Sequence, residues 1–386
     1  MGHESAGELL GAGGPFSRAL TDFLLRAPQQ QMADAVEQAL QQRSALVVEA
    51  GTGTGKTYAY LTPALRSGGR VVVSTGTKNL QDQLFFRDLP RVRDTLALPV
   101  RVSLLKGRAN YLCLYRLRKA QMDPRGRVRR DRLQQVDEWA HRTSSGEIAE
   151  LGSVAGDDLL LPAITSTADN CLGAKCPDFA ECHVVKARRA AQAADLVVVN
   201  HHLLFSDFRL KQEGFGVLPG VDAVIVDEAH QLPELAAQFF GERVSTRQLL
   251  DLVRDCGTEM QEFRDMPELG EAVDALAIAA SELERPFMEL GGRVAWRQFG
   301  ALPGAVSALG AARSALGECG EQLKRYAERS AGLETCAQRA AGLVKRLELI
   351  AADDESPQAA AASVRWVEAV GRGGALHSAP VEPTEG

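Results

Sequence analysis

The chain has 386 residues, which is enough for two or three domains, and a formal net charge of −6 at neutral pH. This negative balance excludes a global basic field for nucleic acid, so contact with such a partner requires a local basic patch. No apolar run approaches the ~20 residues of a membrane-spanning helix. Residues 1–14 carry two glutamates and no long apolar core, unlike a signal peptide. We therefore expect a soluble, intracellular protein.

A glycine-rich turn follows the first predicted strand. The apolar run 45–49 predicts that strand, and the run 58–65 predicts the helix after the turn. Glycines at alternate positions free the backbone, so that N–H groups can point inward at a phosphate. Lys56 would reach the β- and γ-phosphates, and the Thr57 hydroxyl would ligate Mg²⁺ at the helix N-terminus. The predicted nucleotide site comprises Ala50, Gly51, Thr52, Gly53, Thr54, Gly55, Lys56 and Thr57.

Further apolar runs predict the rest of a sheet. They alternate with helical segments and lie at residues 70–75, 100–105, 196–199 and 223–226. Continuous apolar runs are typical of strands that are buried on both faces. Strands and helices that alternate along the chain predict an α/β fold with a parallel sheet, the RecA-like core of a phosphate-loop NTPase.

Two adjacent carboxylates follow the run 223–226. Ligands bind at the carboxyl ends of strands in open α/β sheets, so Asp227 and Glu228 are expected at the site. Asp227 would hold Mg²⁺ through its water shell, and Glu228 would orient and deprotonate the attacking water. The predicted catalytic residues are therefore Lys56, Asp227 and Glu228, and His230 is expected to couple ATP to movement.

Four cysteines lie in the segment 106–189, which interrupts the α/β pattern. They are Cys113, Cys171, Cys176 and Cys182. The odd total of seven cysteines argues against a disulfide framework. The spacing lacks the two C-x2-C pairs of common zinc sites, whereas cubane iron–sulfur clusters tolerate irregular spacing. The spacing favours a metal or cluster over unrelated buried thiols and leaves zinc and iron–sulfur open, with His183 as an alternative ligand.

The first part of this segment is basic. Residues 106–132 carry ten Lys and Arg side chains against two Asp side chains. So local a charge favours a phosphate-backbone track, with Tyr111 and Tyr115 stacking on bases, over a solvated basic helix. Residues 236–368 are helical in composition, and Ser245 and Gln248 suggest a capping box. Pro286, Gly291, Gly292 and Pro303 are expected to divide this stretch into several helices.

These motifs together resemble the DinG/XPD-type superfamily 2 helicases, most closely their bacterial YoaA/DinG-like branch. The matching segments are 26–29 with Met32, 50–57, 74–84, 106–113, 194–204 and 227–230. The resemblance implies a [4Fe-4S] cluster on Cys113, Cys171, Cys176 and Cys182. It also implies nucleotide contacts from Arg26 and Gln29, with Gln29 recognising adenine. DNA contacts are expected from Thr75, Lys78, Arg108, Tyr111, Arg116, Asn200 and His201.

The activity implied by the resemblance is ATP-dependent 5′-to-3′ unwinding of single-stranded or forked DNA in repair or replication, in the bacterial cytosol or nucleoid. The expected parts are a lead-in at 1–25, a first motor domain at 26–105 and 190–235, an iron–sulfur insert at 106–189, an Arch-like helical insert at 236–370 and a tail at 371–386. The family's S-A-T and Q-x-x-G-R-x-x-R motifs do not follow His230. We therefore expect the N-terminal portion of a helicase, without its second RecA-like domain.

That departure leaves other functions open. In the family, the Q-x-x-G-R-x-x-R motif supplies an arginine finger, which raises the rate of phosphoryl transfer by ~10³–10⁵ where one acts. The first alternative is therefore a cluster-bearing DNA-binding module without motor activity, completed by an unknown repair or replication partner. An unrelated phosphate-loop ATPase, such as a transporter subunit, is the second. It predicts no cluster and leaves the four cysteines and the basic run unexplained.

Overall fold

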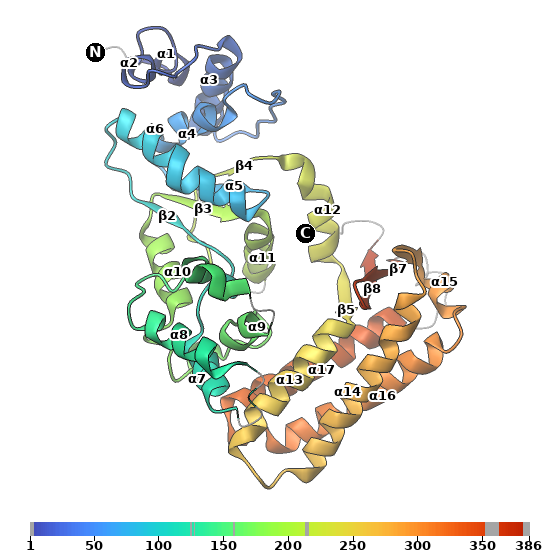
Figure 1. Ribbon diagram of the computed structural model, residues 1–386. Coiled ribbons are helices and arrows are strands. Elements are labelled where there is room, and N and C mark those ends of the chain that lie inside the picture. The colour runs from blue at the N-terminus through green and yellow to red at the C-terminus, as the bar shows by residue number, and fades with distance from the viewer. Residues whose placement is uncertain are drawn as a thin grey trace. The chain divides into compact units, whose positions relative to one another are not determined.

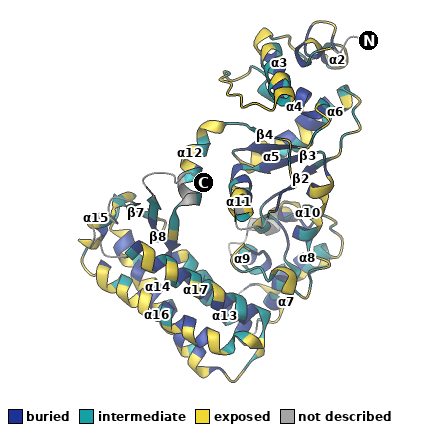
Figure 2. Ribbon diagram, turned by 180° about the vertical axis from the view of Figure 1, so that it is seen from behind, coloured by how far each residue is buried: buried dark blue, intermediate teal, exposed yellow. Residues whose placement is uncertain are grey.

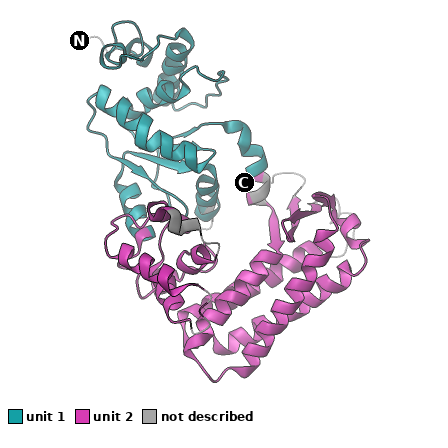
Figure 3. Ribbon diagram, viewed as in Figure 1, with its two compact units in different colours: residues 1–107, 184–235 teal, residues 108–183, 236–386 magenta. Residues whose placement is uncertain are grey.

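The computed structural model (Figure 1) describes residues 4–123, 126, 128–156, 159–212, 216–351 and 363–380. The chain divides into two compact units, residues 1–107 with 184–235 and residues 108–183 with 236–386 (Figure 3). Among the described residues, none of the helices combines the length and apolar character needed to cross a membrane.

A parallel sheet forms the centre of the first unit. Its strands are β1 (Val71–Thr75), β2 (Val102–Leu104), β3 (Leu196–Asn200) and β4 (Ala223–Val226), in the order β2-β3-β1-β4. All three pairings are parallel, and Thr75 lies opposite Asn200 at the carboxyl ends of β1 and β3. β1 is buried along its whole length, and the neighbouring β3 is buried except at its last residue (Figure 2). The predicted parallel α/β sheet is confirmed.

This unit also contains helices. They are α1 (Ala6–Leu9), α2 (Pro15–Ala19), α3 (Ala27–Gln42), α4 (Lys56–Arg66), α5 (Lys78–Gln83), α6 (Leu89–Thr95), α10 (His183–Ala193) and α11 (His201–Gln212). The helix α12 (Leu232–Phe240) begins in this unit and ends in the second. A π-helical turn, Leu84–Asp88, joins α5 to α6. The lead-in is part of the unit, because Leu10 and Phe16 are buried in the same core as Ala33 of α3.

The expected strand at residues 45–49 is not formed. Residues 44–50 have no regular secondary structure, and Val47 is 96% exposed. A strand needs a neighbour for its backbone groups, and a cavity of about 920 Å³ is lined by this segment and by β4. Within the described chain, the segment therefore has the composition of a strand without a strand to pair with.

The second unit begins with the cysteine-bearing segment. Its helices are α7 (Leu114–Gln121), α8 (Arg130–Ala140) and α9 (Leu160–Ile164), with short 3₁₀ turns between them. Leu112, Leu117, Leu133, Val136 and Leu160 form a small apolar core of their own. This core fixes α7 at the exit of Cys113, which is the residue that precedes the helix.

Long helices and a second sheet complete this unit. The helices are α13 (Thr246–Glu259), α14 (Pro267–Met288), α15 (Trp296–Gly300), α16 (Ala305–Tyr326) and α17 (Ala331–Ala351). The strands β5 (Glu242–Ser245), β6 (Arg293–Ala295), β7 (Ser363–Val370) and β8 (Gly373–Pro380) form an antiparallel sheet in the order β5-β8-β7-β6. Ser245 and Gln248 make the predicted capping box at the start of α13.

Two expectations for this stretch differ from the structure. Pro286 does not end a helix, because it lies buried in the last turn of α14, where a proline removes only one intrahelical hydrogen bond. Residues 373–380 form β8 instead of part of a tail. Ala375 and Leu376 are buried in that strand, and burial of this kind stabilises it. Residues 381–386 of the expected tail lie outside the described part of the chain.

Candidate nucleotide-binding site and four-cysteine site

The glycine-rich loop leads directly into α4, whose first residue is Lys56. Gly53 and Gly55 have φ angles of 78° and 85°, which only glycine adopts without strain. A side chain on Gly55 would also overlap the amide of Gln29. The loop therefore needs glycine at position 55 for two independent reasons, one in the backbone and one in packing.

Gln29 lies under this loop. It is 1% exposed, and its Nε2 donates a 2.9 Å hydrogen bond to the carbonyl oxygen of Gly55. Its Oε1 is buried and has no hydrogen-bond partner among the described residues. Arg26, the other expected nucleotide contact, is the half-exposed residue before α3. The structure thus shows Gln29 fixing the loop, a positioning contact that the sequence motif did not reveal.

The two carboxylates lie at the carboxyl end of β4, as predicted. Lys56 Nζ is 3.5 Å from Glu228 Oε1 and 3.4 Å from the carbonyl oxygen of Ala50. Glu228 has a φ of 56°, a left-handed conformation that a non-glycine residue rarely adopts and that clusters at functional sites. His230 is 72% exposed and lies 3.5 Å from Glu228 Oε2. Lys56 and Glu228, which are 172 positions apart in the sequence, therefore lie in one site.

Tyr60 belongs to the site but was not predicted. Its hydroxyl donates a 3.3 Å hydrogen bond to Asp227 Oδ2. Burial raises the pKa of Tyr60 and, with the charge of Glu228, raises the pKa of Asp227 against the opposing effect of Lys56. Tyr60 follows Lys56 by four residues, so both side chains share one face of α4. That spacing was the only available signal.

Polar residues also lie at the ends of β1 and β3. Ser74 Oγ is 2.7 Å from Nδ1 of His201, which is fully buried and whose pKa is lowered by burial. Asn200 Oδ1 accepts a 2.8 Å hydrogen bond from Leu203 N and so caps α11. Of the residues expected to contact DNA here, Thr75 and His201 are buried and Lys78 is exposed.

The four cysteines are free thiols of intermediate exposure, all in the second unit. Burial raises the pKa of Cys113 to about 11, and the charges of Cys176 and Cys171 add to the shift. Burial raises the pKa of Cys176, a hydrogen bond from the Asp178 backbone opposes this, and the charges of Cys171 and Cys182 add to the increase. The four thiols are therefore close enough to influence each other, and their number and chemistry suit a cubane cluster. Among the described residues, however, no set of three or more His, Cys, Asp or Glu side chains is placed to hold a metal ion.

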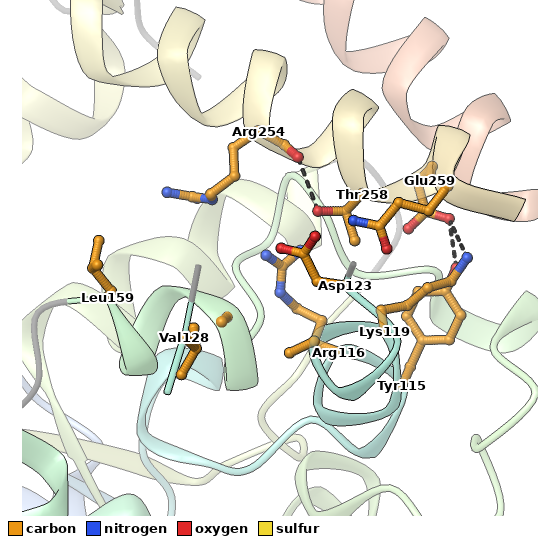
Figure 4. Close-up of a pocket in the computed structure, with 12 residues that line it drawn as sticks. Tyr115, Arg116, Lys119, Asp123, Val128, Leu159, Arg254, Thr258 and Glu259 are labelled. Atoms are coloured by element: carbon orange, nitrogen blue, oxygen red, sulfur yellow. Dashed lines mark hydrogen bonds and ion pairs between the residues drawn. The ribbon is translucent and has the colours of Figure 1, made fainter. Parts of the chain in front are cut away.

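The basic run is largely occupied by acidic partners. Tyr115 OH donates a 2.6 Å hydrogen bond to Glu259 Oε2, and Lys119 Nζ lies 3.2 Å from the same oxygen. Figure 4 shows these side chains of α7 facing α13. Tyr111 is 2% exposed and Arg116 is 8% exposed. In this structure these residues are packed inside the unit, so neither is available as a stacking or phosphate-binding surface. Arg108 is half-buried, whereas Arg125 and Arg127 lie outside the described residues.

Asp255 of α13 is the centre of that contact. Its carboxylate lies 3.0 Å from Arg116 Nη1 and 2.7 Å from Arg339 Nη1 of α17, and it accepts a 3.2 Å hydrogen bond from Asn170 Nδ2. Burial acts to raise the pKa of Asp255, but Arg116, Arg339 and Arg254 lower it overall. Arg116 and Asn170 flank Cys113 and Cys171 in sequence, so this carboxylate ties both ends of the cysteine segment to the helices.

A glycine-rich loop at a helix N-terminus, with a lysine facing two carboxylates at the end of a parallel sheet, is typical of phosphate-loop nucleotide-binding proteins. The sequence matches the family described as DEAD/DEAH box helicase over residues 27–122. It is 45% identical over 332 residues to the protein named ATP-dependent DNA helicase YoaA of Escherichia coli strain K12, covering 85% of this chain and 52% of that protein.

Other relatives agree. A protein of the same name from Haemophilus influenzae is 48% identical over 270 residues, which are 68% of this chain and 42% of that protein. The ATP-dependent helicase DinG of Mycobacterium tuberculosis is 42% identical over 233 residues, which are 54% of this chain and 34% of that protein. The chain contains a DEAD/DEAH box helicase domain and is homologous to the YoaA and DinG helicases. It spans about half the length of the E. coli relative.

One solved structure is also similar. It is described as Truncated XPD, is 13% identical in sequence, covers 81% of this chain and 82% of its own, and superposes with a TM-score of 0.37. The fold assignment depends on the strand order and pairing in the chain itself.

Proposed function

We propose that this chain is the nucleotide-binding portion of an ATP-dependent DNA helicase that couples ATP hydrolysis to movement along single-stranded DNA. The observation that carries the proposal is the approach of Lys56 Nζ to Glu228 Oε1 at 3.5 Å, at the carboxyl end of the parallel sheet. Such a site holds phosphate groups and a water molecule in line for phosphoryl transfer. The names of the relatives support the reaction and the DNA substrate.

Each residue of the site has a role in this proposal. Backbone N–H groups of residues 50–57 bind the phosphates. Lys56 leaves its ion pair with Glu228 and binds the phosphates instead. Thr57 and Asp227 hold Mg²⁺, with Tyr60 orienting the Asp227 carboxylate. Glu228, once released from Lys56, orients and deprotonates the attacking water. Gln29 and Arg26 lie beside the loop as candidates for the base of the nucleotide.

The remaining assignments extend from the resemblance. We assign Cys113, Cys171, Cys176 and Cys182 to a [4Fe-4S] cluster, which would supply a rigid tie between distant parts of the cysteine segment. We assign the DNA contacts to Lys78 and Asn200 of the first unit and to Arg108 of the cysteine segment, because Thr75 and His201 are buried. We also propose 5′-to-3′ polarity, single-stranded or forked DNA in repair or replication as the substrate, and the cytosol or nucleoid as the location.

A second candidate is a cluster-bearing DNA-binding module without motor activity of its own. It is favoured by one observation, the segment before the phosphate loop, which has no strand partner among the described residues. Both candidates share the nucleotide site and differ in turnover.

ATP hydrolysis with and without single-stranded DNA separates the two candidates, with Lys56→Ala as the blank. DNA-stimulated turnover at least ten times the blank supports an autonomous motor. Turnover equal to the blank, in protein that still binds nucleotide and DNA, supports the DNA-binding module instead.

A further inference from the structure

His201 is a polar side chain in the interior of the first unit. It follows β3 directly and is the first residue of α11. Its exposed fraction is 0%, whereas histidine is of intermediate burial in most globular proteins. His202, the next residue, is exposed. The sequence Asn-His-His at residues 200–202 therefore contains one buried and one exposed histidine, and the buried ring requires a structural explanation.

The surroundings of the buried ring are polar. Nδ1 of His201 lies 2.7 Å from Ser74 Oγ, and both residues are fully buried. Its Nε2 is also buried and has no hydrogen-bond partner among the described residues. Burial lowers the pKa of His201, while the Asp227 backbone and the charge of Glu228 oppose this shift. The ring therefore lies close both to the end of β1 and to the turn that carries the two carboxylates.

Ser74 connects this ring to the carboxylate proposed for magnesium. The backbone N–H of Asp227 donates a 2.9 Å hydrogen bond to the carbonyl oxygen of Ser74. Ser74 also lies opposite Val199 of β3 and Val226 of β4, between the two strands that lead into His201 and Asp227. A single residue thus contacts His201 through its side chain and Asp227 through its main chain.

The turn attached to Ser74 needs such support. Glu228 has a φ of 56°, a conformation that persists only where the surrounding structure fixes it. Its N–H donates to Asp227 Oδ1 at 3.1 Å, so the orientation of that carboxylate depends on the same backbone. Loss of the imidazole would leave the Ser74 hydroxyl buried without this partner, which is unfavourable. We expect the end of β1 to shift in response, and Asp227 to shift with it.

We propose that His201 is a positioning residue of the nucleotide site, which holds Asp227 in place for Mg²⁺ through Ser74. We assign it no contact with nucleotide or metal. Groups that act from behind a metal ligand in this way change metal affinity by about 10–100-fold. This role takes the place of the DNA contact that the sequence motif predicted, because the ring is fully buried. The inference rests on the proposed function for the use of Mg-ATP and does not require turnover.

Titration of a fluorescent ATP analogue, in excess Mg²⁺ and in EDTA, tests this role. We expect His201→Ala to weaken binding about ten-fold in Mg²⁺ and to leave binding in EDTA unchanged, since only the metal-dependent contact is lost. His201→Asn should retain the affinity in Mg²⁺, because its amide can bond the Ser74 hydroxyl from the position of Nδ1. His202→Ala is the matched control and should bind as the wild-type chain does.

Ser74→Ala tests the same contact from its other side and removes only one oxygen atom. Its loss in Mg²⁺ should equal that of His201→Ala, and the double variant should lose no more than either, as expected for residues that act together. Where His201→Ala does not fold, as judged by circular dichroism, Ser74→Ala supplies the comparison.

Two results would overturn the role of His201. One is wild-type affinity in Mg²⁺ for folded His201→Ala and Ser74→Ala. The other is an equal loss with and without Mg²⁺, which indicates general damage to the site. Failure of the proposed motor has a different signature, because it appears as absent DNA-stimulated hydrolysis while the Mg²⁺-dependent loss in His201→Ala persists.

Discussion

At the scale of single residues, Asp227 is the group whose protonation decides whether the site can hold a cation. Burial and Glu228 raise its pKa, while Lys56 and the Tyr60 hydroxyl lower it. Because the folded-state pKa is raised, the protonated carboxyl is the form that folding favours. Its contribution to stability is complete below the ordinary pKa of an aspartate and is lost as the pH rises through the raised value.

Magnesium binding should therefore weaken as the pH falls. Mg²⁺ requires the ionised carboxylate, so we expect Mg-nucleotide affinity to decrease as the pH is lowered through the raised pKa of Asp227, with proton release on binding. Calorimetry across pH 4.5 to 8 in buffers of different ionisation enthalpy measures both effects. Asp227→Asn should abolish the pH dependence, and an unchanged dependence in that variant would assign it to another group.

In the second unit, Asp255 is the buried carboxylate on which the packing of the helices depends. Its side chain is 4% exposed and is shared by Arg116 and Arg339, which are 10% and 6% exposed. Removing one partner of a buried ion pair costs about 3–5 kcal/mol, because the remaining charge stays buried. We expect Asp255→Ala to lower the free energy of unfolding by about that amount in urea denaturation.

Asp251 provides the matched control, since it lies one turn earlier on α13 and pairs with the more exposed Arg254 at 2.8 Å. An exposed pair of this kind contributes about 0.2–1 kcal/mol. Equal losses in Asp251→Ala and Asp255→Ala would contradict the central position of Asp255 in the unit.

At the scale of elements, the start of α4 depends on one glycine. Gly55 has a left-handed φ and packs against Gln29, whose Nε2 bonds the Gly55 carbonyl. Any side chain at this position strains the backbone by about 1–3 kcal/mol and displaces the amide beneath it. The loop conformation and the helix start are therefore one structural feature, which explains why the phosphate loop could be predicted from eight letters of sequence.

Gly55→Ala should lose nucleotide binding and destabilise the first unit by about 1–3 kcal/mol. Gly51→Ala is its stability control, because Gly51 has no left-handed φ and meets only Thr54 at 4.0 Å. Thermal unfolding of both variants, with fluorescent-nucleotide titration of Gly55→Ala, gives the comparison. Equal stability of the two alanine variants would show that the observed conformation of Gly55 is not required.

Other elements were predictable only in part. The strands β1, β3 and β4 follow from continuous β-branched runs, because such runs have few alternatives to a buried sheet. The run 45–49 has the same composition but lacks a neighbour, and composition alone contains no information about pairing. The charges of α7 were also misleading. Arg116 and Lys119 find Asp255 and Glu259 about 140 positions later, a contact that no local pattern indicates.

At the scale of the whole molecule, the chain combines two units, each assembled from segments distant in sequence. The first unit is interrupted by the cysteine segment, and the cysteine segment packs with the helices that follow residue 236. Cys113, Cys171, Cys176 and Cys182 all lie in one continuous segment of the second unit. The cysteine site is therefore separable by mutation from the nucleotide site, which lies in the first unit.

Cys171→Ser should lose iron and single-stranded DNA binding while nucleotide binding persists, because its thiol lies in the second unit. Iron and sulfide analysis after anaerobic preparation, with DNA anisotropy titration, provides the measurements. Cys256→Ala, which removes a fully buried thiol of the helical core, should retain iron. Retained DNA affinity in iron-free Cys171→Ser would contradict a structural role for the cluster in DNA binding.

The central claim is that Lys56, Asp227 and Glu228 form a nucleotide triphosphate site in this chain. Titration calorimetry with Mg-ATP measures it most directly, since binding does not require turnover. We expect the wild-type chain to bind, Lys56→Ala to lose at least ten-fold in affinity, and Glu228→Gln to bind at least as tightly because Lys56 is freed from its carboxylate partner. Equal affinity of the wild-type chain and Lys56→Ala would contradict the account.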